Sequence, residues 1–130
     1  MAPMTVECAA ATGDGRQAKA TQFLDAAAVV AMMADDEADV LDACVTLLVH
    51  AGIAAADAIC CARLGRHAQG TDHRDAIELL AGVDGSLAKD LGVLLGMKTQ
   101  AGYSARAMTA EKHRRAVRAT TRLVEAARSR

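Results

Sequence analysis

Three basic side chains with acid–base and anion-binding chemistry lie close together near the middle of the chain. The stretch LGRHAQGTDH holds Arg66 and His67 and, after a glycine, His73. Histidine can transfer protons near neutral pH, and arginine can hold a phosphate through two parallel hydrogen bonds. Together they suit metal-independent cleavage of RNA, in which one histidine takes the 2′-hydroxyl proton and the arginine stabilises the charged phosphorane. The alternative is a solvated loop, because loops with two basic residues are common.

A histidine and a carboxylate precede this loop on an apolar segment. His50 and Asp57 are seven residues apart, two turns of a helix, so they share one face. Asp57 lies within GIAAADAICCA, where a buried carboxylate is costly unless it is paired. The candidate partners are basic groups of the following segment: Arg63, Arg66, His73 and Arg74. Asp57 either ties the loop to the rest of the fold or belongs to a functional pocket.

The elements that must position these groups are predicted to be helices. The chain is rich in alanine and has a single proline, which favours helix throughout its body. Helices are expected over residues 16–34, 38–64, 72–81, 87–100 and 109–129, with Thr71 and Thr109 as N-caps and Gly65 ending the second helix. Residues 1–15 are expected to be a flexible tail, and residues 16–130 one all-α, four- to five-helix up-and-down bundle without a β-sheet.

The second expected helix is apolar nearly all round, so we expect it to be central. Its segment 52–58 has almost no side-chain bulk, so a neighbouring helix or a second subunit can approach closely there. Soluble monomers rarely leave such an apolar surface uncovered. The sequence therefore predicts a two-fold homodimer through part of this helix or of the fourth.

Charge is divided unevenly along the chain. Residues 1–57 hold 2 basic and 9 acidic residues, and residues 58–130 hold 13 basic and 7 acidic residues. Arg114, Arg118 and Arg122 form one stripe on the last expected helix, which is either a solvated face or a phosphate-binding ridge. Tyr103 and Phe23 are the only aromatic rings of the Phe, Tyr and Trp type, which argues against base-specific recognition of single strands.

Cysteine usage and hydropathy bear on the compartment. Cys8, Cys44, Cys60 and Cys61 lack metal-ligand spacing, and we expect small buried thiols in a reducing cytoplasm. The first residues lack the pattern of a signal peptide, and no apolar run approaches the ~20 residues of a membrane span. A cytoplasmic protein without membrane contact, metal or cofactor is expected.

Three segments in this order resemble the HEPN superfamily of small helical bundles (higher eukaryote and prokaryote nucleotide-binding). The segments are AGIAAADAICCA, LGRHAQGTDH and KTQAGYS, the last of which carries the late tyrosine Tyr103. The similarity covers roughly residues 18–127 and is greatest to stand-alone members of actinobacterial type. It implies a four- to five-helix bundle that is often dimeric.

The resemblance also implies a nucleic-acid or nucleotide-directed function of toxin–antitoxin or defence type. Many members are ribonuclease toxins or partners of small nucleotidyltransferases, so RNA, a nucleotide and an antitoxin of that type are the expected partners. Arg66, His67 and His73 are the positions that can match the catalytic residues of the family. Binding roles are expected for Asp57, His50, Arg63, Arg74, Lys98 and Tyr103. Other members act as non-catalytic binding or interaction modules, which is the alternative for this chain.

Overall fold

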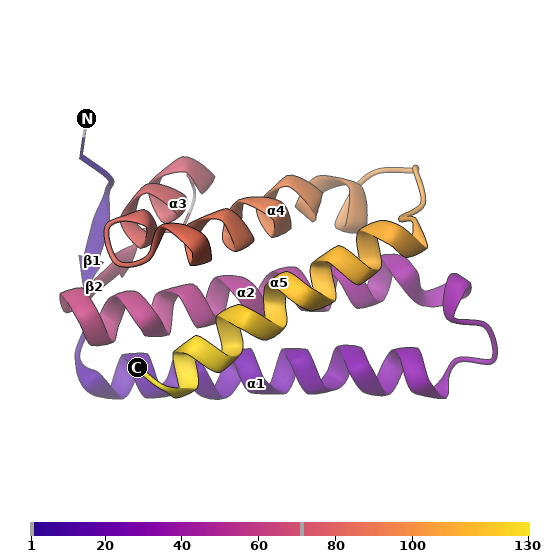
Figure 1. Cartoon of the computed structure of the whole chain (residues 1–130), viewed down its shortest axis with the longest axis horizontal. Coiled ribbons are helices and arrows are strands. Elements are labelled where there is room, and N and C mark those ends of the chain that lie inside the picture. Colours follow the sequence, from indigo (N-terminus) through magenta and orange to yellow (C-terminus); the bar gives the residue numbers. More distant parts are fainter. Residues whose placement is uncertain (1, 71) are drawn as a thin grey trace.

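Five α-helices arranged up and down make up most of the chain in a computed structural model that describes residues 2–70 and 72–130 (Figure 1). The helices are α1 (Ala10–Met33), α2 (Leu41–Leu64), α3 (His73–Ala81), α4 (Gly85–Gly102) and α5 (Ala110–Arg128), and the 3-10 turn η1 (Glu37–Val40) leads into α2. The all-α expectation is confirmed. The expectation of no β-sheet is wrong, because two short strands, β1 (Thr5–Glu7) and β2 (Arg66–Ala68), form a small two-stranded sheet.

α2 is the central helix, as its apolar circumference predicted. α1 and α4 lie along its two sides and α5 crosses it obliquely (Figure 1). A Cβ placed on Gly52 would lie 2.3 Å from Cδ1 of Leu94 and 3.4 Å from Cδ1 of Leu123. The small-residue tract therefore receives helices of the same chain, α4 and α5, so it is not free to receive a second subunit.

The turn η1 and α2 together, Glu37–Leu64, are long and apolar enough to cross a membrane, with a mean hydropathy of 1.9 in the most apolar window. We expected no apolar segment of this length, and that expectation is wrong when length and composition alone are considered. However, 72% of that window is buried inside the bundle. This is compatible with the core helix of a soluble protein.

The N-terminal segment is more ordered than the expected flexible tail. α1 begins at Ala10, well before the expected residue 16, and so includes part of the expected tail. A Cβ on Gly13 would lie 3.3 Å from Cβ of Cys61, so this glycine allows α1 to approach the end of α2. Before α1, β1 pairs antiparallel with β2, with Val6 opposite His67.

Cys8 and Cys61 form a disulfide, with their Cα atoms 5.8 Å apart. The expectation of reduced thiols is wrong for this pair, whereas Cys44 and Cys60 are buried free thiols as expected. The pairing arises because α1 runs antiparallel to α2. This brings the start of α1 beside the end of α2, although 53 residues separate the two cysteines in sequence.

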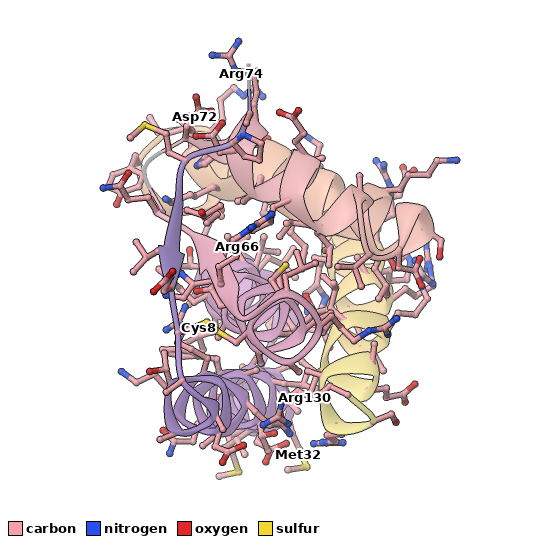
Figure 2. All side chains as sticks on the ribbon, turned by 90° about the vertical axis from the view of Figure 1, so that its left-hand side faces the viewer. Cys8, Met32, Arg66, Asp72, Arg74 and Arg130 are labelled. Carbon is pink, nitrogen blue, oxygen red and sulfur yellow. A yellow bond between two sulfur atoms is a disulfide. The ribbon has the colours of Figure 1, made fainter. Side chains whose placement is uncertain are left out.

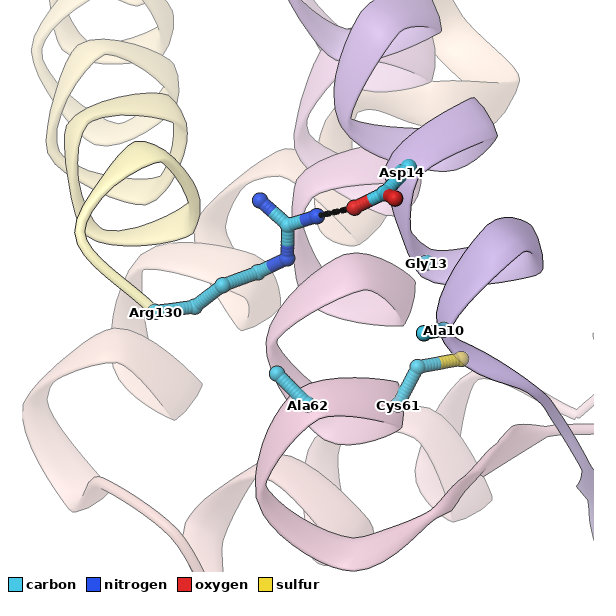
Figure 3. Close-up of a pocket in the computed structure, with 6 residues that line it drawn as sticks. All are labelled: Ala10, Gly13, Asp14, Cys61, Ala62 and Arg130. Carbon is cyan, nitrogen blue, oxygen red and sulfur yellow. Dashed lines mark hydrogen bonds and ion pairs between the residues drawn. The ribbon is translucent and has the colours of Figure 1, made fainter.

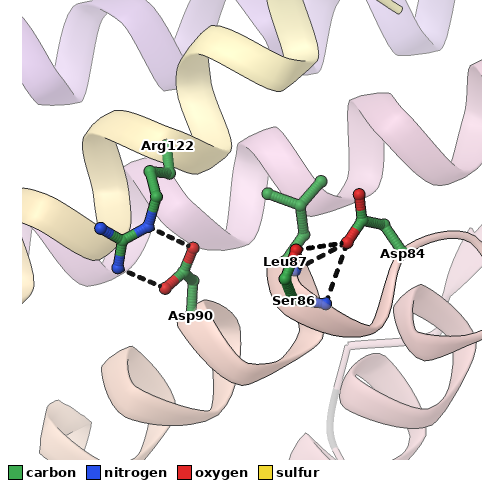
Figure 4. A network of polar contacts seen from close by, with 5 residues as sticks. All are labelled: Asp84, Ser86, Leu87, Asp90 and Arg122. Atoms are coloured by element: carbon green, nitrogen blue, oxygen red, sulfur yellow. Dashed lines mark hydrogen bonds and ion pairs between the residues drawn. The ribbon is translucent and has the colours of Figure 1, made fainter.

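Short polar side chains cap the N-termini of three of the helices. Asp72 accepts a hydrogen bond from the Arg74 amide at the start of α3, and Asp84 accepts from the Ser86 and Leu87 amides at the start of α4 (Figure 4). Thr109 caps α5, as predicted. Thr71, the expected cap of the third helix, lies outside the described residues. Gly65 ends α2 with a left-handed φ of 72°, which glycine adopts without steric cost.

Candidate ligand-binding site between α2 and α4

Two cavities share a lysine on the side of α2 that faces α4. The larger, about 130 Å³, is lined by Thr46, Val49, His50, Lys98, Gly102 and Tyr103. Three of the expected binding residues therefore meet here. His50 lies on α2 and Lys98 on α4, and Tyr103 is the residue that directly follows α4.

The second cavity, about 40 Å³, lies nearer the end of α2. Its polar lining consists of Asp57, Asp72, His73 and Lys98, from α2, the segment before α3, α3 and α4. Ala68 and Gly70 close it from the side of β2. We call the set of His50, Asp57, His73, Lys98 and Tyr103 the α2–α4 site, because Lys98 lines both cavities.

α1 contributes two side chains that hold residues of the α2–α4 site. Nε of Arg16 donates a hydrogen bond to Oδ2 of Asp57 at 3.0 Å. The ring of Phe23 lies 5.7 Å from that of His50, between centroids, at 37°. Arg16 and Phe23 are seven residues apart, as are His50 and Asp57, so two matching pairs align along antiparallel helices.

Asp57 is partly buried and paired, but with a different cation from those expected. The predicted partners were Arg63, Arg66, His73 and Arg74, and the observed salt bridge is to Arg16. Desolvation raises the pKa of the Asp57 carboxyl, against the lowering effect of the nearby charges of Arg16 and His67 and of the hydrogen bond from Arg16. The charged form is therefore costly in this position, and Arg16 compensates only in part.

His67 lies on β2 and is partly buried. Its Nδ1 lies 2.7 Å from the carbonyl oxygen of Ala68. A carbonyl can only accept, so this contact is a hydrogen bond when Nδ1 carries the proton. The charge of His67 also acts on the pKa of Asp57. His67 thus belongs to the surroundings of the α2–α4 site although it lines neither cavity.

The arginines of the loop are placed differently from His73. Arg66 is exposed on β2, opposite Glu7 of β1, and is absent from the lining of the cavity that holds His73. Arg74 is exposed and contacts Asp72 at 3.4 Å. Arg63 is exposed near the end of α2, and its charge acts on Asp84 at the start of α4. The described geometry thus gathers His73 with Asp57 and Lys98, and places Arg66 on the exposed strand.

Arg16, Phe23 and Thr46 are contributors that sequence reasoning did not single out. Arg16 is the first residue of a helix that is expected from the sequence, and its neighbours along the chain do not indicate a partner. The matched seven-residue spacing described above fits the pairing of Arg16 with Asp57, but only once the register of α1 against α2 is known. No protein-family model, curated protein or solved structure matches this chain. Within residues 2–70 and 72–130, no three His, Cys, Asp or Glu residues are grouped to hold a metal ion.

Proposed function

We propose that the chain is a HEPN-like, nucleotide-directed binding module that holds a phosphate of single-stranded RNA or of a nucleotide at the α2–α4 site. The supporting observation is that Lys98 lines both cavities, with His50 and Tyr103 at the larger one. A lysine is a point charge suited to phosphate, and histidine adds a hydrogen-bond donor. This proposal extends the family resemblance of the sequence.

The cavity size favours a phosphate over an enclosed nucleotide. Pockets that enclose drug-sized ligands typically measure about 300–1,000 Å³, whereas the larger cavity measures about 130 Å³. A base would therefore remain outside. Tyr103 is 82% exposed beside this cavity, and an exposed ring of this kind can stack on a base without selecting its identity.

Binding is favoured over cleavage because the proposed catalytic pair is not gathered at one cavity. Arg66 lies exposed on β2, whereas His73 lines the smaller cavity together with Lys98. The metal-independent endoribonuclease is the second candidate, supported by Lys98, which lines one cavity with His50 and the other with His73. Two histidines and a cation can serve as base, acid and charge stabiliser in such a reaction.

The test uses a short fluorescein-labelled single-stranded RNA and fluorescence anisotropy. Lys98→Gln removes the charge at similar length, and we expect Kd to rise about tenfold, equivalent to ~1.4 kcal/mol. Lys89→Gln is the matched control, since Lys89 is an exposed lysine on the same helix. Absence of binding by the wild-type protein, or an equal loss in both variants, would contradict the proposal. Cleavage of the RNA in the presence of EDTA, lost in His73→Ala, would favour the nuclease.

The proposal includes a homodimer, which is supported by an apolar patch at the end of α1. Met32 is 74% exposed and Met33 75% exposed, and Val29 and Val117 are further exposed apolar side chains. Figure 2 shows Met32 on the outer side of α1, away from α2. Between α1 and α5 lies a cavity of about 170 Å³ with an almost wholly apolar lining. Methionine and arginine are enriched in protein interfaces, so this surface replaces α2 as the proposed contact.

Charge supports a second copy of the chain as the occupant. The apolar cavity lies between an acidic and a basic segment. On the side of α1 and the turn after it, Asp25, Asp35 and Asp36 are exposed, and on α5, Arg114, Arg115 and Arg118 are exposed. A two-fold axis parallel to the cavity would set the acidic side of each copy against the basic side of the other.

Sedimentation of two charge-reversed variants tests this arrangement. One replaces the three aspartates with lysine, and the other replaces the three arginines with glutamate. Each variant alone is expected to be monomeric, because like charges oppose each other, and their mixture is expected to form a heterodimer. A monomeric wild-type protein, or a mixture that stays monomeric, would contradict the dimer.

A cytoplasmic location is retained as part of the proposal. In that compartment thiols are kept reduced, so the Cys8–Cys61 pair would be open for much of the time. Blocking free thiols in lysed cells before purification, followed by mass spectrometry of the Cys8 and Cys61 peptides, tests this. A fully formed disulfide in the blocked sample would contradict the cytoplasmic placement.

A further inference from the structure

The N-terminal segment 4–8, which contains β1, is attached to both ends of segment 65–69, which carries His67. At one end the amide of Cys8 donates to the carbonyl of Gly65 at 3.0 Å. Further along, the amide of Gln69 donates to the carbonyl of Met4 at 3.1 Å. Between them, β1 and β2 pair over three residues each. Figure 2 shows β1 running along the edge of the molecule from the disulfide toward α3.

A third contact extends this attachment to α3. The amide of Met4 donates to Oδ2 of Asp75 at 3.2 Å, two residues after His73. β1 therefore pairs with the strand that carries His67, and the residue just before β1 contacts the helix that carries His73. Within the described residues, β1 is the only strand paired with β2.

Backbone pairing alone holds such a strand weakly. An isolated two-stranded sheet is marginally stable in water, and Val6 and Glu7 of β1 are exposed. The Cys8–Cys61 disulfide is the covalent link that keeps β1 beside β2. Because a cross-link acts mainly by restricting the open chain, breaking it would favour release of the strand.

Cys61, one partner in the disulfide, is among the residues that line a cavity at the start of α1 (Figure 3). This cavity measures about 400 Å³ and is lined by Ala10, Gly13, Asp14, Cys61, Ala62 and Arg130. Arg130 donates to Asp14 there. Cys61 is only 8% exposed, so a small molecule that enters the cavity can approach this residue more readily than the surface of a folded protein can.

We propose that the Cys8–Cys61 bond is an exchange site for a low-molecular-weight thiol, and that exchange there releases β1 from β2. The thiolate of the small molecule attacks Sγ of Cys61 and forms a new S–S bond. The Cys8–Cys61 bond breaks, and its electron pair leaves on Sγ of Cys8, which takes a proton from water. A second molecule of the thiol then attacks the mixed disulfide, leaving a reduced Cys61 and a small-molecule disulfide.

Cys8 is the thiol that can reverse the first step, by attacking the mixed disulfide on Cys61 and expelling the small thiolate. Cys60 adjoins Cys61 in sequence but does not take this role. Burial raises the pKa of Cys60 to about 11, with a contribution from Asp57, so it stays a thiol at neutral pH and is a poor nucleophile.

The consequence for ligand binding rests on the proposed function of the α2–α4 site. Release of β1 removes the backbone partners of β2 and the contact at Asp75, so the segment that presents Ala68, Gly70 and His73 to the smaller cavity becomes less ordered. We expect the affinity for labelled RNA to be lower in the reduced protein than in the oxidised one.

Glutathione is the probe for the test. Oxidised protein is incubated with glutathione at neutral pH, and mass spectrometry and hydrogen–deuterium exchange are recorded. We expect a glutathione adduct on Cys61, reduction of the pair, and faster amide exchange at residues 66–69. Cys8→Ser should exchange rapidly at these residues without glutathione, and Cys60→Ser should behave like the wild-type protein.

Two results would overturn the proposal. One is a disulfide that resists glutathione while the protein stays folded, and the other is unchanged amide exchange at residues 66–69 after reduction. An RNA affinity that is equal in both redox states would overturn its regulatory part. If the wild-type protein binds no RNA at all, only the proposed function fails, because adduct formation and amide exchange are measured without RNA.

Discussion

Arg122 donates two parallel hydrogen bonds to Asp90, from Nε at 2.8 Å and from Nη2 at 2.7 Å (Figure 4). Asp90 is 8% exposed and lies on α4, whereas Arg122 lies on α5. One member of the arginine stripe on α5 therefore joins two helices, and the pKa of Arg122 is raised by its hydrogen bond to Asp90 and by the charge of that residue. This pairing gives Arg122 a structural role in joining α4 to α5, which differs from the phosphate-binding role that the arginine stripe allowed.

The first prediction follows from this pair. Arg122→Ala leaves the carboxylate of Asp90 without its main partner in a buried position, which is unfavourable. We expect a lower melting temperature, measured by circular dichroism. Arg118→Ala is the matched control on the same helix, because Arg118 is exposed, and it should change the melting temperature little. Equal effects of both substitutions would show that the paired geometry contributes nothing specific.

The second prediction concerns pH and Asp57. Its folded-state pKa is raised above the ordinary 3.8, chiefly by desolvation, so the folded protein binds this proton more tightly than the unfolded chain. The contribution of Asp57 to the unfolding free energy is therefore greatest below pH 3.8 and declines as pH rises through the folded-state pKa.

Asp57→Asn removes this titration while keeping an oxygen that can accept from Arg16. Chemical denaturation of both proteins across this pH range should show a wild-type advantage that shrinks as pH rises. A difference that stays constant with pH would mean that the pKa of Asp57 is the same in the folded and unfolded states.

The third prediction contrasts two helical glycines. Gly52→Ala places a Cβ 2.3 Å from Cδ1 of Leu94, and such overpacking costs about 1–3 kcal/mol. The gain in helix propensity, about 1 kcal/mol, does not offset a typical cost of this size. We expect a net loss of about 1 kcal/mol in the free energy of unfolding.

Gly96→Ala should have the opposite sign. Apart from the backbone of the helix itself, no atom lies within 4 Å of the added Cβ. Gly96 is exposed to solvent and lies away from both ends of α4. A gain of about 0.5–1 kcal/mol is expected. Urea denaturation measures both variants, and a stabilised Gly52→Ala would mean that Leu94 moves aside without cost.

Local patterns in the sequence predicted much of the architecture. The helical periods placed five helices, Gly65 and Thr109 were assigned correctly as helix ends, and the apolar circumference of the second helix indicated its central position. The seven-residue spacing of His50 and Asp57 placed both on the side of α2 that lines the α2–α4 site. These features depend on residues within a few turns of one another, which a single chain reveals through its own periodicity.

The contacts between distant segments were decided by the tertiary structure alone. Examples are the salt bridge of Arg16 with Asp57, the disulfide of Cys8 with Cys61 and the pairing of β1 with β2. All three join the first sixteen residues to the second half of α2 or the strand after it. They exist because α1 packs antiparallel along α2, and the register of that packing is set by close approach at small residues such as Gly13, which the spacing of residues along the chain does not encode.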